Sequence, residues 1–183
     1  MAKAKRPKKD RRRQEIDDSI TAKAARRVLS DVRVVKGDLN VAIENNDIMR
    51  TRIAWITAIT LLRTVGHVLA KVDVRRATWL KDAINAKHRA VKQDPFNNLL
   101  FHEFIEEERN LVLKEYKASI FDTVKDDAGA KSVVLTNIQV GTEVFSPADA
   151  VAAAVRYWER YLDDVEERAL AARTMARATS KRI

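Results

Sequence analysis

The sequence predicts a mainly α-helical protein: a multi-helix bundle with a small β-hairpin insertion at about 131–145 and a basic N-terminal arm. Three observations predict this fold class. Apolar residues recur at spacings of three and four over most of the 183-residue chain, which is the pattern of amphipathic helices. Only four Gly and three Pro interrupt the chain, and helix-forming residues dominate its composition. The stretch 131–145 is instead rich in β-branched residues.

The chain divides into a basic arm at 1–13, a single helical domain at 14–176 and a frayed basic tail at 177–183. The arm holds one Asp and eight cationic residues, Lys3, Lys5, Arg6, Lys8, Lys9, Arg11, Arg12 and Arg13. Its net charge of +7 accounts for most of the chain's +9. A block of like charges resists folding and attracts polyanions by releasing counterions. We interpret the arm as a nucleic-acid-binding segment, with a solubilising or targeting tail as the alternative.

Two helices are expected in the first part of the domain. The first spans 14–36 and ends at Gly37 and Asp38, and 38–46 forms either a short helix or an irregular link. The second spans 48–72 and carries a wide apolar stripe, which is typical of a helix at the centre of a bundle. Gly66 in its interior costs about 1 kcal/mol relative to Ala. Close approach of another helix would explain its presence there.

Two further helices follow in the middle of the chain. Asp73 is expected to cap a helix at about 74–91. Asp94 and Pro95 then form a start signal, a cap acceptor followed by Pro at the first helical position. We expect this fourth helix to run to about Ser119.

The hairpin and a long final helix complete the domain. The strands of the hairpin meet either at Asn137-Ile138 or around Gly141-Thr142. Ser146-Pro147 is another start signal, for a last helix that runs to about Ala176. A lone hairpin is marginal in water, so we expect it to pack on the helices or on a partner.

Several classes of function are disfavoured by composition. The chain has no Cys, which excludes disulfides, thiolate metal sites and a Cys nucleophile. Its three His residues are too scattered to predict a zinc site, and no phosphate-cradling Gly loop or dinucleotide fingerprint is present. No run of about 18 apolar residues and no apolar N-terminal signal occurs. We therefore expect no metal, no cofactor and no membrane span, in a cytoplasmic protein.

The segment 102–117, HEFIEEERNLVLKEYK, carries the clearest functional signal. Arg109 and Asn110 lie amid the apolar residues of an expected core helix, where a polar pair needs either a partner or a function. Ion pairing of Arg109 with a Glu of its own helix is the structural alternative. Lys114 is four residues after Asn110 and Tyr116 is seven after Arg109, so each pair shares a helix face.

A second polar pair lies in the central helix, where Arg63 and His67 are four residues apart. If the two helices pack together, these side chains converge with those of the first segment. Guanidinium groups bind phosphate, an imidazole changes charge near neutral pH, and an amide and a phenol can orient a ligand. This composition favours phosphodiester binding or cleavage. A satisfied core histidine is the alternative interpretation of His67.

The first segment resembles the motif of the HEPN superfamily, whose members are helical bundles and in many cases metal-independent ribonucleases. That motif is an Arg, often followed by a polar residue, then about four to six residues and a His, sometimes with a Tyr two further on. Arg109, Asn110 and Tyr116 match it, but Lys114 stands where the His is expected. A lysine amine is ordinarily protonated at neutral pH and cannot act as a general base.

The resemblance implies that Arg109 and His67 are the catalytic residues, with Arg63, Asn110, Lys114 and Tyr116 binding the ligand. It equally allows a non-catalytic member that binds nucleotide or serves as a partner subunit. We weigh three classes of function: an RNA-directed protein of this kind, a non-enzymatic nucleic-acid-binding or regulatory subunit that uses the arm, and a structural bundle that docks a protein. Expected partners are nucleic acid, with RNA favoured over DNA, or another acidic molecule. A homodimer and a cognate regulatory protein are further candidates.

Overall fold

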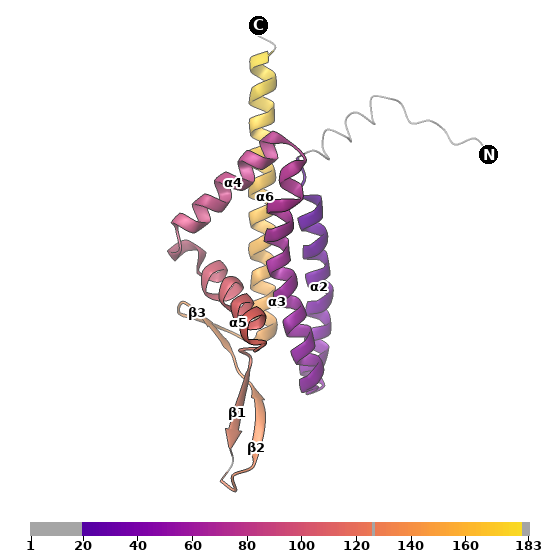
Figure 1. The fold of residues 1–183 in the computed structure, drawn as a ribbon, viewed down its shortest axis with the longest axis vertical. Coiled ribbons are helices and arrows are strands. Elements are labelled where there is room, and N and C mark those ends of the chain that lie inside the picture. Colours follow the sequence, from indigo (N-terminus) through magenta and orange to yellow (C-terminus); the bar gives the residue numbers. More distant parts are fainter. Residues whose placement is uncertain (1–19, 126, 181–183) are drawn as a thin grey trace, which may run out of the picture.

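The computed structural model describes residues 20–125 and 127–180, and within them the mainly helical fold is confirmed (Figure 1). The α-helices are α2 (Lys23–Glu44), α3 (Ile48–Lys71), α4 (Thr78–Gln93), α5 (Glu107–Glu115) and α6 (Pro147–Ser180). Two short 3₁₀ turns, η1 (Asp73–Arg75) and η2 (Phe96–Asn98), and a π-helix, η3 (Leu100–Glu106), connect them. The strands are β1 (Phe121–Lys125), β2 (Lys131–Leu135), β3 (Ile138–Val140) and β4 (Glu143–Phe145). The predicted arm at 1–13 lies outside the described residues.

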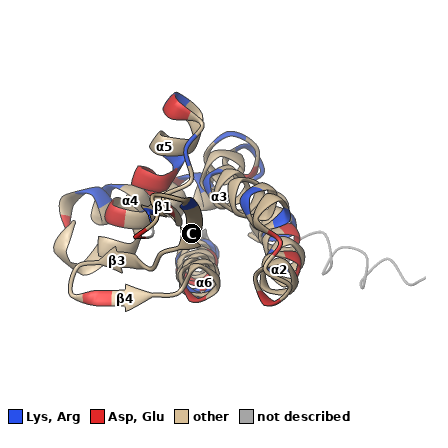
Figure 2. Cartoon of the chain, turned by 90° about the horizontal axis from the view of Figure 1, so that it is seen from below, with Lys and Arg blue, Asp and Glu red and all other residues tan. Residues whose placement is uncertain are grey.

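Three long helices, α2, α3 and α6, run side by side along the length of the molecule (Figure 1). Seen along this direction, α2 lies on one side, and α4 with the β3–β4 hairpin lies on the other, with α3 and α6 between them (Figure 2). The segments α4 and η3–α5 form a V whose open side faces the long helices and whose apex points away from them (Figure 1). One apolar core joins all of these elements, and its largest fully buried side chains are Trp55 and Phe104.

Helix α2 corrects the prediction of a helix that ends at Gly37. The helix continues through Gly37 to Glu44, because Leu39 and Ala42 beyond the glycine are buried and keep the apolar stripe on the core. The energy of burying these two side chains exceeds the cost of about 1 kcal/mol for a glycine in the helix. The chain then turns at Asn45 and Asn46, and the carboxylate of Asp47 accepts a hydrogen bond from the first turn of α3, as expected of a cap.

Asp73 does not cap the helix that follows it, contrary to our prediction. Its buried carboxylate accepts hydrogen bonds from the backbone N–H groups of Ala24 (3.1 Å) and Ala25 (2.9 Å). These belong to the first turn of α2, where N–H groups have no partner within the helix. Asp73 therefore joins the end of α3 to the beginning of α2, while α4 starts at Thr78 without a side-chain cap.

The helix predicted from Asp94 to Ser119 is broken and shorter. Asp94 does begin it, because its carboxylate accepts a hydrogen bond from the backbone N–H of Asn97 at 3.2 Å. The segment then passes through η2, η3 and α5 and ends at Glu115. Tyr116 adopts a left-handed conformation (φ 52°), and its N–H donates to the carbonyl of Val112, which closes the helix.

The β region holds two antiparallel hairpins. β3 pairs with β4 around Gly141, whose φ of +56° suits a glycine, so the second of the two predicted turn positions is confirmed. β2 pairs instead with β1, a strand that the sequence did not predict, in a register that places Thr123 opposite Val133. The β1–β2 hairpin projects beyond the helices (Figure 1).

Helix α6 begins where predicted and continues to Ser180, through the first part of the expected frayed tail. Ser146 caps it, since its hydroxyl oxygen accepts from the N–H of Asp149 at 3.2 Å. The close approach expected at Gly66 is confirmed: a Cβ there would lie 2.8 Å from the ring of Trp158.

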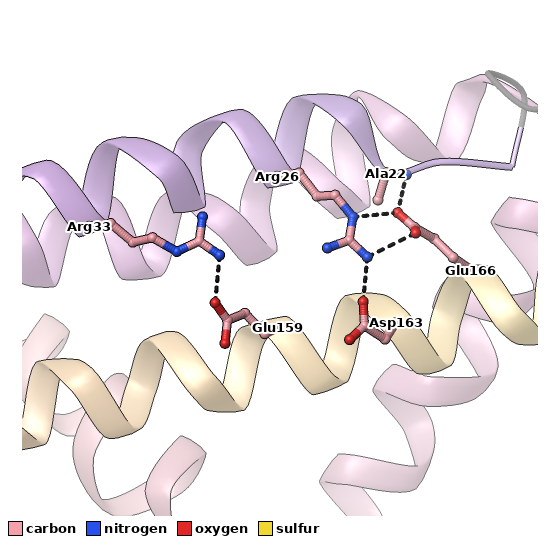
Figure 3. Close-up of polar contacts among 6 residues, drawn as sticks. All are labelled: Ala22, Arg26, Arg33, Glu159, Asp163 and Glu166. Atoms are coloured by element: carbon pink, nitrogen blue, oxygen red, sulfur yellow. Dashed lines mark hydrogen bonds and ion pairs between the residues drawn. The ribbon is translucent and has the colours of Figure 1, made fainter.

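Ion pairs join α2 to α6 along their length (Figure 3). Arg26 contacts Asp163 at 2.6 Å and Glu166 at 2.9 Å, and Arg33 contacts Glu159 at 2.5 Å. Hydrogen bonds to Glu166 and then Asp163 raise the pKa of Arg26 against the opposing effect of burial. Glu166 also accepts from the N–H of Ala22, which fixes the entry into α2.

Among the described residues, one segment, Ile48–Arg75, is long and apolar enough to cross a membrane. In the fold it is the helix at the centre of the bundle, and Trp55, Leu62 and Leu69 are buried against its neighbours. Core helices of bundles share this composition. The absence of a membrane span therefore stays a prediction.

A cationic cavity as the candidate functional site

A cavity of about 350 Å³ lies inside the V formed by α4 and η3–α5, against α3 and α6. Six side chains that are cations or imidazoles line it: Arg63, His67 and Lys71 from α3, His88 and Lys92 from α4, and Arg109 from α5. One acid, Glu106, and one amide, Asn85, lie among them. This excess of positive charge suits an anionic ligand.

Arg63 and Arg109 approach the cavity from different helices, and both are half-buried. Among the described residues, no ion pair with a carboxylate is found for either guanidinium. The Nε atom of Arg109 is buried and has no hydrogen-bond partner. A buried donor without a partner is unfavourable unless a ligand or a water satisfies it. Ion pairing of Arg109 with a Glu of its own helix, the structural alternative, is not observed.

Two imidazoles border the cavity, and both are exposed. His67 is exposed, so its interpretation as a core histidine is wrong. Burial lowers the pKa of His88, and the positive charge of Lys92 lowers it further against a weaker opposite effect of Glu106. The lowered pKa favours the neutral form of His88, which can accept a hydrogen bond or a proton.

Aromatic side chains close the inner end of the cavity. Trp158 packs against Phe101 edge to face at 6.2 Å between ring centres and against Tyr161 at 5.2 Å. Burial raises the pKa of Tyr161, so its phenol stays protonated. This wall excludes water from one side of the cavity and strengthens electrostatic interactions within it.

The π-helix η3 places three residues in the cavity wall: Phe101, Ile105 and Glu106. π-helical turns are rare, and they occur frequently at functional sites. His102 faces another way, since its ring nitrogens contact the carbonyl of Val91 (3.2 Å) and the carboxylate of Glu106 (3.3 Å). The contact of His102 with the carbonyl of Val91 thus ties η3 to α4. Within the described residues, no group of three or more His, Asp or Glu side chains is placed to hold a metal ion.

A smaller apolar groove of about 230 Å³ adjoins the same cations between α3 and α5. Ile59, Val112 and Leu113 line it together with three residues of the cavity, Arg63, His67 and Arg109. These three side chains therefore border both spaces.

The structure brings together three of the predicted site residues, Arg63, His67 and Arg109, and separates the others. Asn110 is half-buried and Lys114 is exposed, and neither is among the residues that line the cavity. Tyr116 lies beyond the end of α5, where its ring packs on the guanidinium of Arg52 at 5.1 Å. The early end of the helix removes Tyr116 from the face of Arg109, and Lys114 is about 140° around the helix from Arg109.

Sequence reasoning missed His88 and Lys92. They are four residues apart on α4, as Arg63 and His67 are on α3, so the same spacing argument could have found them. Comparison of this chain with protein-family models, with curated proteins and with solved structures finds no match.

Proposed function

We propose that this protein is RNA-directed and binds a phosphodiester group of RNA in the cationic cavity. The observation that carries the proposal is the convergence of Arg63, His67 and Arg109, from two helices distant in the sequence, on one space. Two guanidinium groups without carboxylate partners suit the planar, bidentate binding of a phosphate. The buried Nε of Arg109 provides a donor that such a ligand satisfies.

The neutral imidazole of His88 supports RNA over DNA. A ring nitrogen without a proton accepts a hydrogen bond, and the ribose 2′-hydroxyl is the donor that RNA has and DNA lacks. The cavity therefore combines donors for a phosphate with an acceptor for the adjacent hydroxyl.

The HEPN resemblance agrees with the position of Arg109 but not with the positions of Lys114 and Tyr116. In this chain the imidazoles beside Arg109 come from α3 and α4 rather than from the motif helix itself. RNA binding is the function that this geometry supports best. Metal-independent cleavage would require one imidazole to accept the proton of an attacking hydroxyl.

The test is binding and cleavage of labelled RNA in chelator, with a DNA strand of the same sequence as comparison. We expect Arg109→Ala to weaken RNA binding by about tenfold or more, because it removes charged hydrogen bonds. Arg75→Ala is the matched control, since Arg75 is exposed and is not among the cavity residues. Circular dichroism checks that each variant is folded.

Three results separate the alternatives. Cleavage lost in folded Arg109→Ala and His67→Ala or His88→Asn establishes a ribonuclease. Binding without cleavage, still dependent on Arg109, establishes a non-catalytic RNA-binding protein. A third result would contradict the cavity proposal: RNA binding that is unchanged by Arg63→Ala and Arg109→Ala but is lost when residues 1–13 are removed. The arm would then be the binding element.

The projecting β1–β2 hairpin favours a second candidate function, docking of a protein partner. Val124, Val133 and Val134 are exposed on it, and a two-stranded hairpin without packing is marginally stable in water. Under this alternative the chain shows no RNA affinity beyond its arm. A partner recovered by the intact protein is lost when the hairpin is shortened.

A further inference from the structure

A second groove, of about 470 Å³, lies between η2, the β3–β4 hairpin and α6. It is separate from the cationic cavity, although α6 and the segment 96–101 contribute to both. Arg156 and Arg160 line it from α6, and Phe96 and Asn97 line it from the η2 turn. One acid, Glu143, stands on the opposite wall.

The two arginines of this groove differ from several other arginines of the bundle. Arg156 and Arg160 are four residues apart, share a helix face and are exposed. No carboxylate partner is found for them among the described residues, whereas Arg26, Arg33 and Arg168 all pair with acids. Two guanidinium groups on one helix face, without carboxylate partners in the described part of the chain, suit an anion.

Phe96 is the most exposed large apolar side chain of the described residues, at 81%. It is held there by a hydrogen-bonded turn: Asp94 accepts from Asn97, and the carbonyl of Pro95 accepts from the N–H of Asn98 at 3.0 Å. A phenyl ring held in water beside two arginines is the combination that binds single-stranded nucleic acid, with a base on the ring and phosphates on the cations.

The wall opposite Phe96 is also firmly placed. The N–H of Gly141 donates to the carboxylate of Glu103 at 2.7 Å, and Gly141 packs against the side chain of Leu99. The β3–β4 turn is thereby held against η3, and the groove exists before any ligand binds. Preformed sites lose less entropy on binding than mobile ones.

We propose that this groove is a second RNA subsite, which stacks an unpaired base on Phe96 and binds the neighbouring phosphates through Arg156 and Arg160. The inference rests on the proposed function, because the same RNA strand occupies the cationic cavity. Arg156 and Trp158 are about 200° apart around α6, so the two sites lie on opposite flanks of one helix. The ligand is therefore a single strand that passes from one flank to the other.

The experiment measures affinity of the full chain for labelled polyuridine of about four to about sixteen nucleotides, the range of site sizes of single-strand binders. Affinity for wild type should rise with length until both subsites are filled. Phe96→Ala should weaken binding of the longer strands about fivefold or more and leave the salt dependence unchanged. Phe96→Leu should bind more weakly than wild type as well, because leucine has no ring for a base to stack on. Met175→Ala is the matched control, because it removes an exposed apolar side chain that lies on α6, away from the residues of the groove.

The double variant Arg156→Ala/Arg160→Ala should act differently. It should lower the slope of log affinity against log salt by about 1.4, the value for two phosphates of a single strand. Arg27→Ala/Arg89→Ala is the control, since both are exposed and outside the residues of the two sites. Glu143→Gln removes the one acid of the groove and should strengthen binding about twofold. Because this variant gains affinity, a misfolded protein cannot produce the result.

The outcomes distinguish this inference from the proposed function. Suppose that RNA binding depends on Arg63 and Arg109, while the Phe96 and Arg156/Arg160 variants bind as wild type does. The proposal of a second subsite is then wrong, and the proposal for the cationic cavity is retained. If only the variants of the groove lose binding, the groove is an RNA site and the proposal for the cationic cavity is wrong. If wild type binds no RNA at any length, both are wrong.

Discussion

Glu108 is a carboxyl group with 5% of its surface exposed, next in the chain to Arg109. Burial raises its pKa, and the neighbouring polar groups of Ser119 and Trp55 lower it by less. The unfolded chain therefore ionises at lower pH than the folded protein. As pH rises above the ordinary glutamate value, the unfolded state gains stability first, and the free energy of unfolding falls.

Glu108→Gln removes this ionisation while keeping the shape of the side chain. We expect it to raise the midpoint of thermal unfolding at about pH 8 and to leave it unchanged below about pH 4, where both states are protonated. Calorimetry at the two pH values measures the difference. Glu107→Gln, at the exposed neighbouring position, should show neither effect. Equal shifts at both pH values would contradict the role of ionisation.

The candidate site was partly predictable at the level of residues. Arg109 was a candidate because a cation amid the apolar residues of a core helix needs a partner or a ligand. Arg63 and His67 were candidates because residues four apart share a helix face. The lowered pKa of His88 was not predictable. It depends first on how the elements around His88 pack, which the sequence does not show, and only then on Lys92, four residues along the same helix.

At the scale of helices, two glycines in similar sequence settings have opposite structural roles. Gly66 lies against the ring of Trp158, whereas a Cβ on Gly37 would meet nothing within 4 Å. We expect Gly66→Ala to destabilise the fold by about 1–3 kcal/mol through overpacking. We expect Gly37→Ala to stabilise it by about 0.5–1 kcal/mol, because alanine favours the helix.

Urea unfolding of the two alanine variants tests this packing. The shifts should have opposite sign, and a second variant, Gly66→Ala with Trp158→Phe, should recover part of the loss by making room. Stabilisation by Gly66→Ala alone would show that the two helices do not approach as closely as the structure has them.

Element boundaries were the less predictable part of the fold. Asp73 precedes a helix and has the residue type of a cap, yet its carboxylate binds the first turn of a helix 48 and 49 positions earlier. A carboxylate accepts hydrogen bonds from any free backbone N–H groups that lie beside it, whether or not they belong to the next helix in the chain. Only the packing of α2 against the end of α3 decides which those are.

At the scale of the whole molecule, the two hairpins contribute unequally. β3 buries Ile138 and Val140 in the core, but most residues of β1 and β2 are exposed. Replacing 122–134 by a short glycine-rich link should change the unfolding midpoint by no more than a few degrees. Ile138→Ala should cost about 2–5 kcal/mol, because it leaves a cavity in the core.

Thermal unfolding of the shortened chain decides between two views of the hairpin. An unchanged midpoint together with unchanged RNA binding fits an appendage for a partner, or one without a role in RNA binding. A large loss of stability would show instead that the bundle needs the β1–β2 hairpin to fold.

The sequence by itself determined the helical class, the position of α3 at the centre of the bundle, and the starts of α3, of the segment from Asp94 and of α6. It also singled out Arg63, His67 and Arg109, which line one cavity. These follow from periodicity and capping, which are local properties of the chain. The tertiary structure alone decided the pairing of β1 with β2, the hydrogen-bond donors that Asp73 accepts from, the packing around His88 and the groove around Phe96. Each of these depends on which distant segments come into contact, and contact is set by the packing of the whole core.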